Sequence, residues 1–339
     1  NEGVGTTTAD LSLNGNNGAL MGLVQWQVTT SCFASTTPPL TYVPDDNFEN
    51  YLEANGMGDG IALNDNILTS AIDTVTYLDV SSQNILDMTG IENFIYLIDL
   101  DCSNNQITNL DVSYNTALKY LECHVNQLTA LDVSNNTVLD YLFCSSNQLT
   151  SIDVSGATAL NYLACRDNQL TSLDVSNNTV LTYLACSYNQ LININVSANT
   201  ALIDLICTSN QLTSLGVSNN TALTTLSFSD NLLTSLDLRN GNNINFIIFN
   251  AQGNASLNCI DVDDATWSTN NWTLANGNID AQHYFSTDCN ATAIEETTSS
   301  EQELLKIVDV LGRENKGTKN KPLFYIYNDG TVEKQIIIE

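Results

Sequence analysis

The chain has 339 residues, of which 38 are Asp or Glu and 9 are Lys or Arg, so its formal net charge is −29 at pH 7. This excess of negative charge argues against binding to nucleic acids or to anionic membrane surfaces. No apolar run in the sequence reaches the roughly 18 residues that a membrane-spanning helix requires.

The charge is distributed unevenly along the chain. Six of the nine basic residues lie beyond position 305: Lys306, Arg313, Lys316, Lys319, Lys321 and Lys334. Five acidic residues share that segment, which leaves residues 306–339 near +1 and residues 1–305 near −30. A break of this kind marks a separate C-terminal module.

Residues 1–40 are rich in Gly, Asn and Thr and match none of the patterns that follow, so they stay unassigned. Residues 41–74 are predicted to form an N-terminal cap. Within them, VPDDNFENYLEANG has the pattern of a short amphipathic helix that begins at Asp45 or Asp46 and ends at Gly56. Its apolar side chains are expected to face inward: Phe48, Tyr51 and Leu52.

Residues 75–256 are built from a 21-residue repeat, with the unit LxxLxCxxNxLTxLDVSxNT. One column of the repeat holds six cysteines and is continued by two phenylalanines: Cys102, Cys123, Cys144, Cys165, Cys186, Cys207, Phe228 and Phe249. An apolar residue lies two positions earlier in each copy, from Leu100 to Ile247. Because side chains alternate along a strand, the Leu and Cys columns share one inward face. Stacked copies bury this face in one continuous core.

Two further columns complete the predicted coil. An asparagine follows the Cys column by three positions in each copy, and we expect these side chains to turn inward and bind backbone groups of adjacent coils. A second apolar pair, from Leu131 and Val133 to Leu236 and Leu238, is expected to pack against the opposite wall.

This unit resembles the leucine-rich repeat, whose strand motif is LxxLxLxxNxL with Cys tolerated at the third leucine. The 21-residue length and the nested LDVSxN half resemble the class called IRREKO. The resemblance implies a β-rich solenoid, a leucine-rich-repeat array of about nine coils with capped ends, followed by a small C-terminal β-hairpin module.

Residues 257–290 are predicted to form a C-terminal cap that closes the array with aromatic side chains. Cys259 lies one full repeat length after Leu238 and is therefore placed in the same column. We expect a disulfide between Cys259 and Cys289 to pin this cap.

The polar, acidic residues 291–303 are predicted to be a linker to a terminal module, residues 304–339. Within that module, PLFYIYNDGTVEKQIII has the pattern of two strands joined by a tight turn at Asn328, Asp329 and Gly330. With the preceding KIVDVLGRE, it is similar to the C-terminal sorting domain of the type IX secretion system. The resemblance implies contact with that translocon and a location outside the cell or on the outer surface of a Gram-negative bacterium.

The cysteine column is interpreted as core rather than as a metal or redox site. Zinc requires four ligands that converge on one point, whereas parallel strands hold these residues in single file about 4.8 Å apart. A column of aspartates in the nested half is the other metal candidate: Asp111, Asp132, Asp153, Asp174 and Asp237. Asn195 and Gly216 interrupt it, which favours carboxylates that accept turn amides over calcium ligands. We expect no metal and no cofactor.

Catalysis finds no support in the sequence. The chain has two histidines, and it lacks a serine elbow and a Gly-rich phosphate loop. His124 falls on the exposed strand face and is interpreted as a surface residue. The sequence therefore predicts a protein that is not an enzyme.

The exposed strand face is the candidate binding surface. Four tyrosines in register lie beside an aromatic and a basic residue, giving the candidate ligand-binding residues: Tyr120, Tyr141, Phe143, Tyr162, Arg166 and Tyr183. Aromatic surfaces of this kind bind sugars or form protein hot spots, although tyrosine also simply favours strand positions in a duplicated repeat. We expect a secreted or cell-surface binding or adhesion module for a protein or glycan. The alternative is a structural protein that self-associates at the cell surface or in the extracellular matrix.

Overall fold

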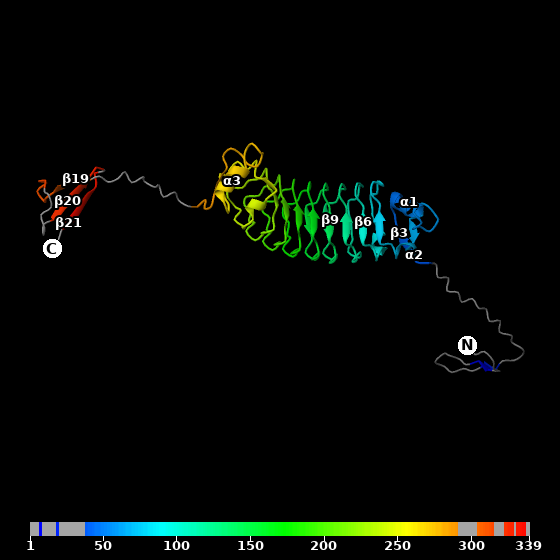
Figure 1. Cartoon of the computed structure of the whole chain (residues 1–339). Helices are drawn as coiled ribbons and strands as arrows, with labels where there is room; N and C mark the ends of the chain where they lie inside the picture. The colour runs from blue at the N-terminus through cyan, green and yellow to red at the C-terminus, as the bar shows by residue number, and fades with distance from the viewer. Residues whose placement is uncertain are drawn as a thin grey trace. The chain divides into compact units, whose positions relative to one another are not determined.

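The structure, a computed structural model, describes residues 7–8, 18–19, 38–290, 304–314, 322–328 and 330–336 (Figure 1). Contacts divide the chain into two compact units, Asn1–Leu191 and Ile192–Glu339, which we call the N-terminal unit and the C-terminal unit. No helix among these described residues is long and apolar enough to cross a membrane. The predicted linker lies outside them, as do Cys32 and most of residues 1–40.

The N-terminal unit begins with a short antiparallel pair, β1 (Thr7–Thr8) and β2 (Gly18–Ala19). A second antiparallel pair, β3 (Leu40–Tyr42) and β4 (Asn66–Leu68), packs with α1 (Asp46–Ala54) and α2 (Thr69–Ile72). The predicted helix is confirmed. Asp45 caps it by accepting hydrogen bonds from the amides of Asn47 and Phe48. Phe48 and Leu52 are buried as expected, whereas Tyr51 is half-buried.

The other oxygen of the Asp45 carboxylate ties this cap to the first coil. It accepts hydrogen bonds from the amides of Leu86 at 2.7 Å and Asp87 at 3.1 Å. A single carboxylate therefore satisfies donors at a helix start and in a repeat loop 41 residues further along the chain.

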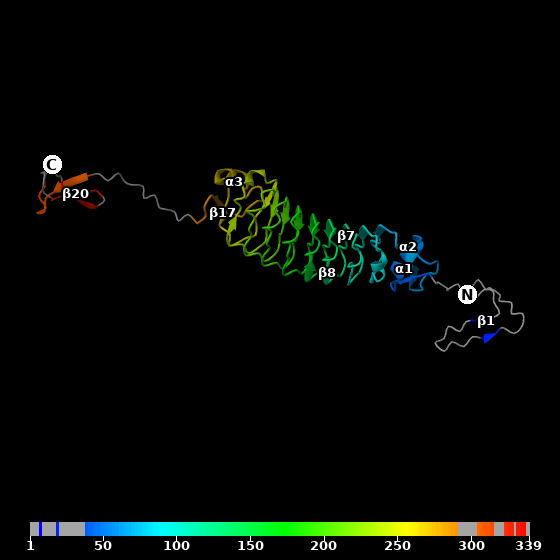
Figure 2. The ribbon, with the colours of Figure 1, turned by 90° about the horizontal axis from the view of Figure 1, so that it is seen from below.

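Six parallel strands form the main wall of the N-terminal unit: β5 (Tyr77–Asp79), β6 (Asp99–Asp101), β7 (Tyr120–Glu122), β9 (Tyr141–Phe143), β11 (Tyr162–Ala164) and β12 (Tyr183–Ala185). They pair in register through their central leucines. The loop between β5 and β6 contains a 3-10 turn, η1 (Ile91–Asn93). On the opposite wall, β8 (Ala130–Asp132) pairs in parallel with β10 (Ser151–Asp153), and Figure 2 shows β7 and β8 at opposite edges of the coils.

The C-terminal unit contains three parallel strands of the same repeat, β13 (Asp204–Ile206), β14 (Thr225–Ser227) and β16 (Ile248–Asn250), which pair in that order. A second parallel sheet contains β15 (Leu236–Asp237), β17 (Cys259–Asp261) and β18 (Tyr284–Ser286), accompanied by η2 (Asn243–Asn245) and α3 (Ala265–Asn271). The last residues form an antiparallel sheet of β19 (Leu304–Val308), β20 (Pro322–Tyr327) and β21 (Val332–Ile336). The predicted solenoid followed by a small hairpin module is confirmed.

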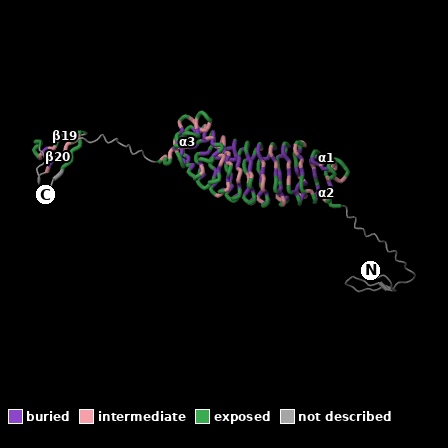
Figure 3. The backbone as a smooth tube through the Cα atoms, viewed as in Figure 1, coloured by how far each residue is buried: buried purple, intermediate pink, exposed green. Residues whose placement is uncertain are grey.

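The inward columns form the core, and buried residues recur in every coil of the N-terminal unit (Figure 3). The six cysteines of the repeat are fully buried and carry no disulfide. Burial raises the pKa of the Cys144 and Cys186 thiols to about 12, and it raises that of Cys102, Cys123 and Cys165 as well. They are neutral core side chains at physiological pH.

The predicted asparagine column makes the expected backbone hydrogen bonds. Asn147 is representative: its Nδ2 donates to the carbonyls of Cys123 and Cys144, and its Oδ1 accepts from the amide of Leu128 at 3.0 Å. Asn105, Asn126, Asn168 and Asn189 repeat the pattern. Each asparagine therefore joins its own coil to a neighbour.

A second asparagine column, not predicted from the sequence, runs through the nested half. Asn115, Asn136 and Asn178 are fully buried, and the Nδ2 of Asn136 donates to the carbonyls of Val112 and Asn115 at 3.0 Å each. The signal was the Asn that directly precedes Thr in the recurring SNNT and SYNT turns.

The predicted register fails in the last repeats. β14 and β16 pair Leu226 with Phe249, so Phe249 occupies the leucine column and the fully buried Ala251 takes the cysteine column. Ile247, expected inward, is 82% exposed. The assignment of Cys259 to the column of Leu238 was also wrong, because β15 and β17 pair Leu236 with Ile260. The chain between the paired residues Leu226 and Phe249, and between Leu236 and Ile260, is longer than the regular repeat. The short helix η2 lies within this longer stretch of chain.

Aromatic packing closes the C-terminal unit. The ring of Trp272 stacks on Phe249 with centroids 4.0 Å apart. Arg239 donates to the carboxylate of Asp237 and, at 3.0 Å, to the carbonyl of Thr287. Cys259 and Cys289 form a disulfide with a Cα–Cα distance of 5.8 Å, which links β17 to the end of the cap.

Candidate ligand-binding face

The side chains on either side of each central leucine project from the main wall, away from the core. We call the exposed side chains of β5, β6, β7, β9, β11 and β12 the strand face. Because the six strands pair in register, each position of the repeat forms a straight column across them. Five of the six predicted ligand-binding residues lie on this face, and the sixth, Arg166, lies two residues beyond the end of β11.

Four tyrosines, which we call the tyrosine ladder, occupy one column: Tyr120, Tyr141, Tyr162 and Tyr183. The rings of Tyr141 and Tyr162 stack with centroids 4.3 Å apart, and those of Tyr162 and Tyr183 stack at 4.2 Å. Tyr120 is tilted by 43° from Tyr141 at 6.5 Å and is 42% exposed. The inner tyrosines therefore cover one another's ring faces and present ring edges and hydroxyl groups to solvent.

Burial raises the pKa of the Tyr141 and Tyr162 hydroxyls. For Tyr162, a hydrogen bond with Tyr183 and the charge of Arg166 act in the opposite direction. Tyr141 and Tyr162 are therefore neutral at physiological pH, and their hydroxyl groups interact along the column.

Phe143 lies in the next column and stacks on His124 with ring centroids 4.2 Å apart. Ala164 and Ala185 follow in that column and are buried. Arg166 is exposed in the third column, where its amide donates to the hydroxyl of Ser145. Among the described residues, no ring contact joins Arg166 to an aromatic side chain, so the structure groups the tyrosines with Phe143 and places Arg166 at their margin.

His124 differs from the expected surface histidine. Its side chain is 20% exposed, and its Nδ1 lies 3.7 Å from the carboxylate of Glu122 without a hydrogen-bond partner among the described residues. Burial lowers the pKa of His124. It packs as a neutral ring beneath the strand face.

Sequence reasoning did not propose a second group on this face, which we call the acidic cluster: Asp79, Asp99, Asp101 and Glu122. In the strand register Asp101 lies directly between Asp79 and Glu122, and Asp99 lies opposite Tyr120. Burial and the neighbouring carboxylates raise the pKa of Asp99 and Glu122. The signal in the sequence was a run of acidic residues in one column over three consecutive copies, Asp79, Asp101 and Glu122, with Asp99 in the adjacent column.

Comparisons with known proteins concern the repeat fold. No protein-family model matches the chain. A segment of 75 residues, 22% of this chain, is 40% identical to internalin J of Listeria monocytogenes and spans 8% of that protein's length. The structure of internalin C2 from Listeria monocytogenes is 21% identical and superposes with a TM-score of 0.50, covering 61% of this chain and 96% of that chain. The chain is a leucine-rich-repeat protein.

A structure of the functional domain of internalin J, described as including a cysteine ladder, is 30% identical over 66% of this leucine-rich-repeat protein and 68% of that chain, with a TM-score of 0.33.

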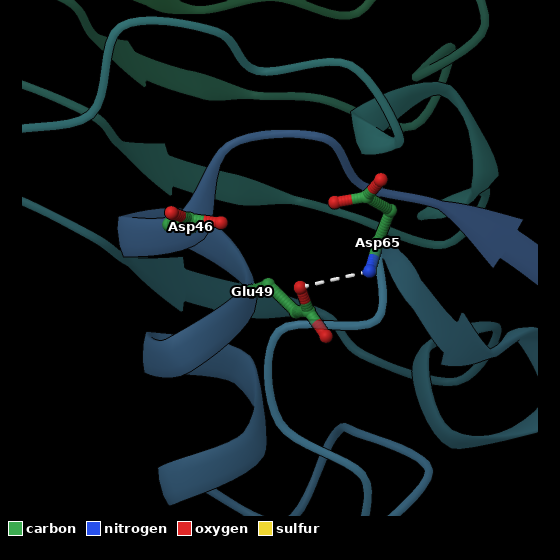
Figure 4. A group of neighbouring side chains, drawn as sticks. All are labelled: Asp46, Glu49 and Asp65. Atoms are coloured by element: carbon green, nitrogen blue, oxygen red, sulfur yellow. Dashed lines mark hydrogen bonds between the residues drawn. The ribbon is translucent and has the colours of Figure 1, made fainter.

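The leucine-rich-repeat protein has one group of three acidic side chains close enough for a shared cation among its described residues: Asp46, Glu49 and Asp65 (Figure 4). Glu49 is fully buried, and its two oxygens accept hydrogen bonds from the amides of Asn64 at 2.9 Å and Asp65 at 3.1 Å. These bonds account for its burial, because they hold the cap loop in which Asp65 has a φ of 59°. We assign Glu49 a structural role.

The aspartate column of the nested half also serves the repeat turns. Asp111, Asp132, Asp153 and Asp174 each accept a hydrogen bond from the amide of the serine two residues later. For Asp111 and Asp153, hydrogen bonding with that serine lowers the carboxyl pKa. Their carboxylates are thus used by the turns, as the sequence predicted.

Proposed function

We propose that this leucine-rich-repeat protein is a secreted or cell-surface binding module whose tyrosine ladder contacts a protein ligand. The observation that carries the proposal is a column of four tyrosines in register on a solvent-facing wall, three of them stacked, next to Phe143. Tyrosine is enriched at the energetic centres of protein interfaces, where its ring is buried and its hydroxyl finds a partner.

The ring geometry favours a protein over a glycan. A sugar stacks on the open face of an aromatic ring. Both faces of Tyr162 are covered, by Tyr141 at 4.3 Å and Tyr183 at 4.2 Å, and one face of Tyr141 is covered by Tyr162. The ladder instead offers a ridge of ring edges and hydroxyl groups, which suits apolar side chains and backbone groups of a protein segment.

The binding test compares two double variants of the full chain. Tyr141→Ala/Tyr162→Ala removes the centre of the ladder, and Tyr96→Ala/Tyr114→Ala removes two exposed tyrosines that lie off the strand face. Each is immobilised and exposed to a biotinylated extract of extracellular proteins and, separately, to a glycan array. Loss of protein binding in the first variant alone supports the proposal, whereas equal binding by both, or binding to glycans alone, contradicts it.

We further propose that residues 304–339 are a sorting domain for the type IX secretion system. The support is the similarity of KIVDVLGRE and the closing strands to that domain, together with a turn between β20 and β21 in which Gly330 has a φ of 86°. The test is a reporter fused to residues 304–339 in a Gram-negative host that has this system. Export that persists after the translocon is deleted would contradict the proposal.

A further inference from the structure

The acidic cluster adjoins the tyrosine ladder, and together they suggest the chemistry of the ligand. We infer that the strand face binds an extended protein segment that carries Lys or Arg residues against the acidic cluster and apolar residues against the tyrosine ladder. This inference rests on the proposed function and narrows its ligand to a basic one.

The acidic cluster holds like charges at adjacent strand positions. Asp101 faces Asp79 on one side and Glu122 on the other, an arrangement that destabilises a sheet when no cation lies between the carboxylates. Among the ion pairs of the described residues, the one that reaches this cluster is His124 with Glu122 at 3.7 Å, and burial lowers the pKa of His124. The described chain therefore leaves these charges without a strong positive partner, which a basic ligand would supply.

A bound metal ion fits the acidic cluster less well than side-chain cations do. A metal ion needs several ligand atoms close together. Among the described residues, the acidic group whose ligand atoms all lie within 4.8 Å of one another is in the N-terminal cap and not on the strand face. The strand-face carboxylates are spread over three strands, about 10 Å from end to end. Several separate cations match this spread better than one ion.

The acidic cluster and the tyrosine ladder meet at β7. Asp99 pairs with Tyr120, and Glu122 pairs with Phe143, so charge gives way to aromatic surface within one strand spacing. The ladder continues for three further strand spacings, about 14 Å. In an extended segment running across the strands, alternate side chains lie about 6.6 Å apart on one side. Two basic residues would reach the cluster, and the next two or three residues on that side would reach the ladder.

A random peptide-display library selected on the full chain tests this inference even though the natural ligand is unidentified. We expect selected peptides to be enriched in Lys or Arg at alternate positions next to apolar residues. A selected peptide should bind the variant Asp101→Asn/Glu122→Gln about tenfold or more weakly than it binds the unchanged chain. Its binding to the unchanged chain should also weaken at high salt.

The matched control is Asp132→Asn/Asp153→Asn, which removes the same charge from the opposite wall, where both side chains are exposed. It should keep the affinity within about twofold, and circular dichroism confirms that each variant folds. Equal loss in the two variants would indicate nonspecific attraction to an acidic chain and would overturn the inference.

The remaining outcomes separate this inference from the proposed function. Selected peptides that lack basic residues and depend on Tyr141 and Tyr162 alone would overturn the inference and leave the proposed function intact. Peptides that depend on neither variant pair would overturn both. Self-association by light scattering that Asp101→Asn/Glu122→Gln abolishes would assign the face to a second copy of the chain and also overturn the inference.

Discussion

The side chain of Asn126 joins two adjacent coils by a hydrogen bond to the backbone carbonyl of Cys102. Its Nδ2 donates to the carbonyl of Cys102, 24 residues earlier, at 3.0 Å, and to the carbonyl of Cys123 in its own coil at 3.2 Å. Its Oδ1 accepts the amide of Ile107 at 3.0 Å. The side chain thus satisfies backbone groups that the tight loop leaves unpaired, and Cys102, Cys123 and Ile107 are all buried.

Replacing this asparagine should destabilise the repeat array. Asn126→Ala leaves the amide of Ile107 without its acceptor and removes two donors from buried carbonyls, so we expect a loss of about 2–4 kcal/mol in the free energy of unfolding. Asn135→Ala, at an exposed position of the next turn, should stay within about 0.5 kcal/mol. Urea denaturation of both variants measures the difference, and similar midpoints would show that the asparagine column does not join the coils energetically.

The 21-residue period was sufficient to predict the leucine, cysteine and first asparagine columns up to Phe228, because each of these positions keeps one environment through many copies. It failed from Ile247 onward because the coil lengthens there, and counting in fixed steps then assigns side chains to the wrong face. At such an insertion the register is set by which residues of adjacent strands pair with each other, and the sequence alone does not show that pairing.

The strand face was predictable as a set of columns but not as a surface. The sequence placed four tyrosines in register, whereas the near-parallel stacking of Tyr162 and Tyr183, with an interplanar angle of 4°, depends on side-chain torsions. The acidic cluster was visible in the same columns. The sequence does not show which of these carboxylates lack a positively charged neighbour, because that depends on how the side chains of the whole strand face are arranged.

The buried thiols should make folding stability depend on alkaline pH. In the folded chain, burial raises the pKa of Cys144 and Cys186 to about 12, whereas an unfolded cysteine titrates near 8.5. Above that value the unfolded state loses protons that the folded state keeps, so stability is fully present below about pH 8.5 and falls as the pH rises toward 12. The slope approaches about 1.4 kcal/mol per pH unit for each cysteine.

Thiol labelling in a Cys32→Ser background measures this directly. Six cysteines should resist labelling in native conditions at pH 8 and all six should react after denaturation. Rapid labelling of the native protein would contradict the core assignment, as would a stability that is flat between pH 8 and 10.

The disulfide between Cys259 and Cys289 should stabilise the C-terminal cap. It closes a loop of 30 residues, and the chain-entropy relation gives about 3–4 kcal/mol for that length. We expect Cys259→Ser/Cys289→Ser to lower the melting temperature and to expose Trp272 to quenchers, since its aromatic packing lies beside β17. An unchanged melting temperature and unchanged quenching would show that aromatic packing alone holds the cap.

Neutralising the acidic cluster should stabilise the protein even while it weakens the proposed ligand contact. In Asp101→Asn the amide oxygen can still accept the hydrogen bond from Ser103, so the main change is the loss of repulsion with Asp79 and Glu122. We expect a gain of about 0.5 kcal/mol in the free energy of unfolding at low ionic strength, and this gain should shrink at high salt.

The pH dependence of this gain follows from Asp99 and Glu122. Their pKa values are raised in the folded state, so the repulsion is present above those values and is relieved as the pH falls through them. The gain from Asp101→Asn should therefore diminish in acid. Asp132→Asn provides the comparison, because Asp132 accepts the amide of Ser134 in the same way but pairs with the carboxylate of Asp153 on the opposite wall. Its gain therefore measures the repulsion of a paired carboxylate away from the acidic cluster, and we expect it to be smaller than the gain at Asp101, which has a carboxylate on each side. A loss of stability in Asp101→Asn at low salt would show that these carboxylates support the fold, and the unrelieved charge would no longer point to a basic ligand.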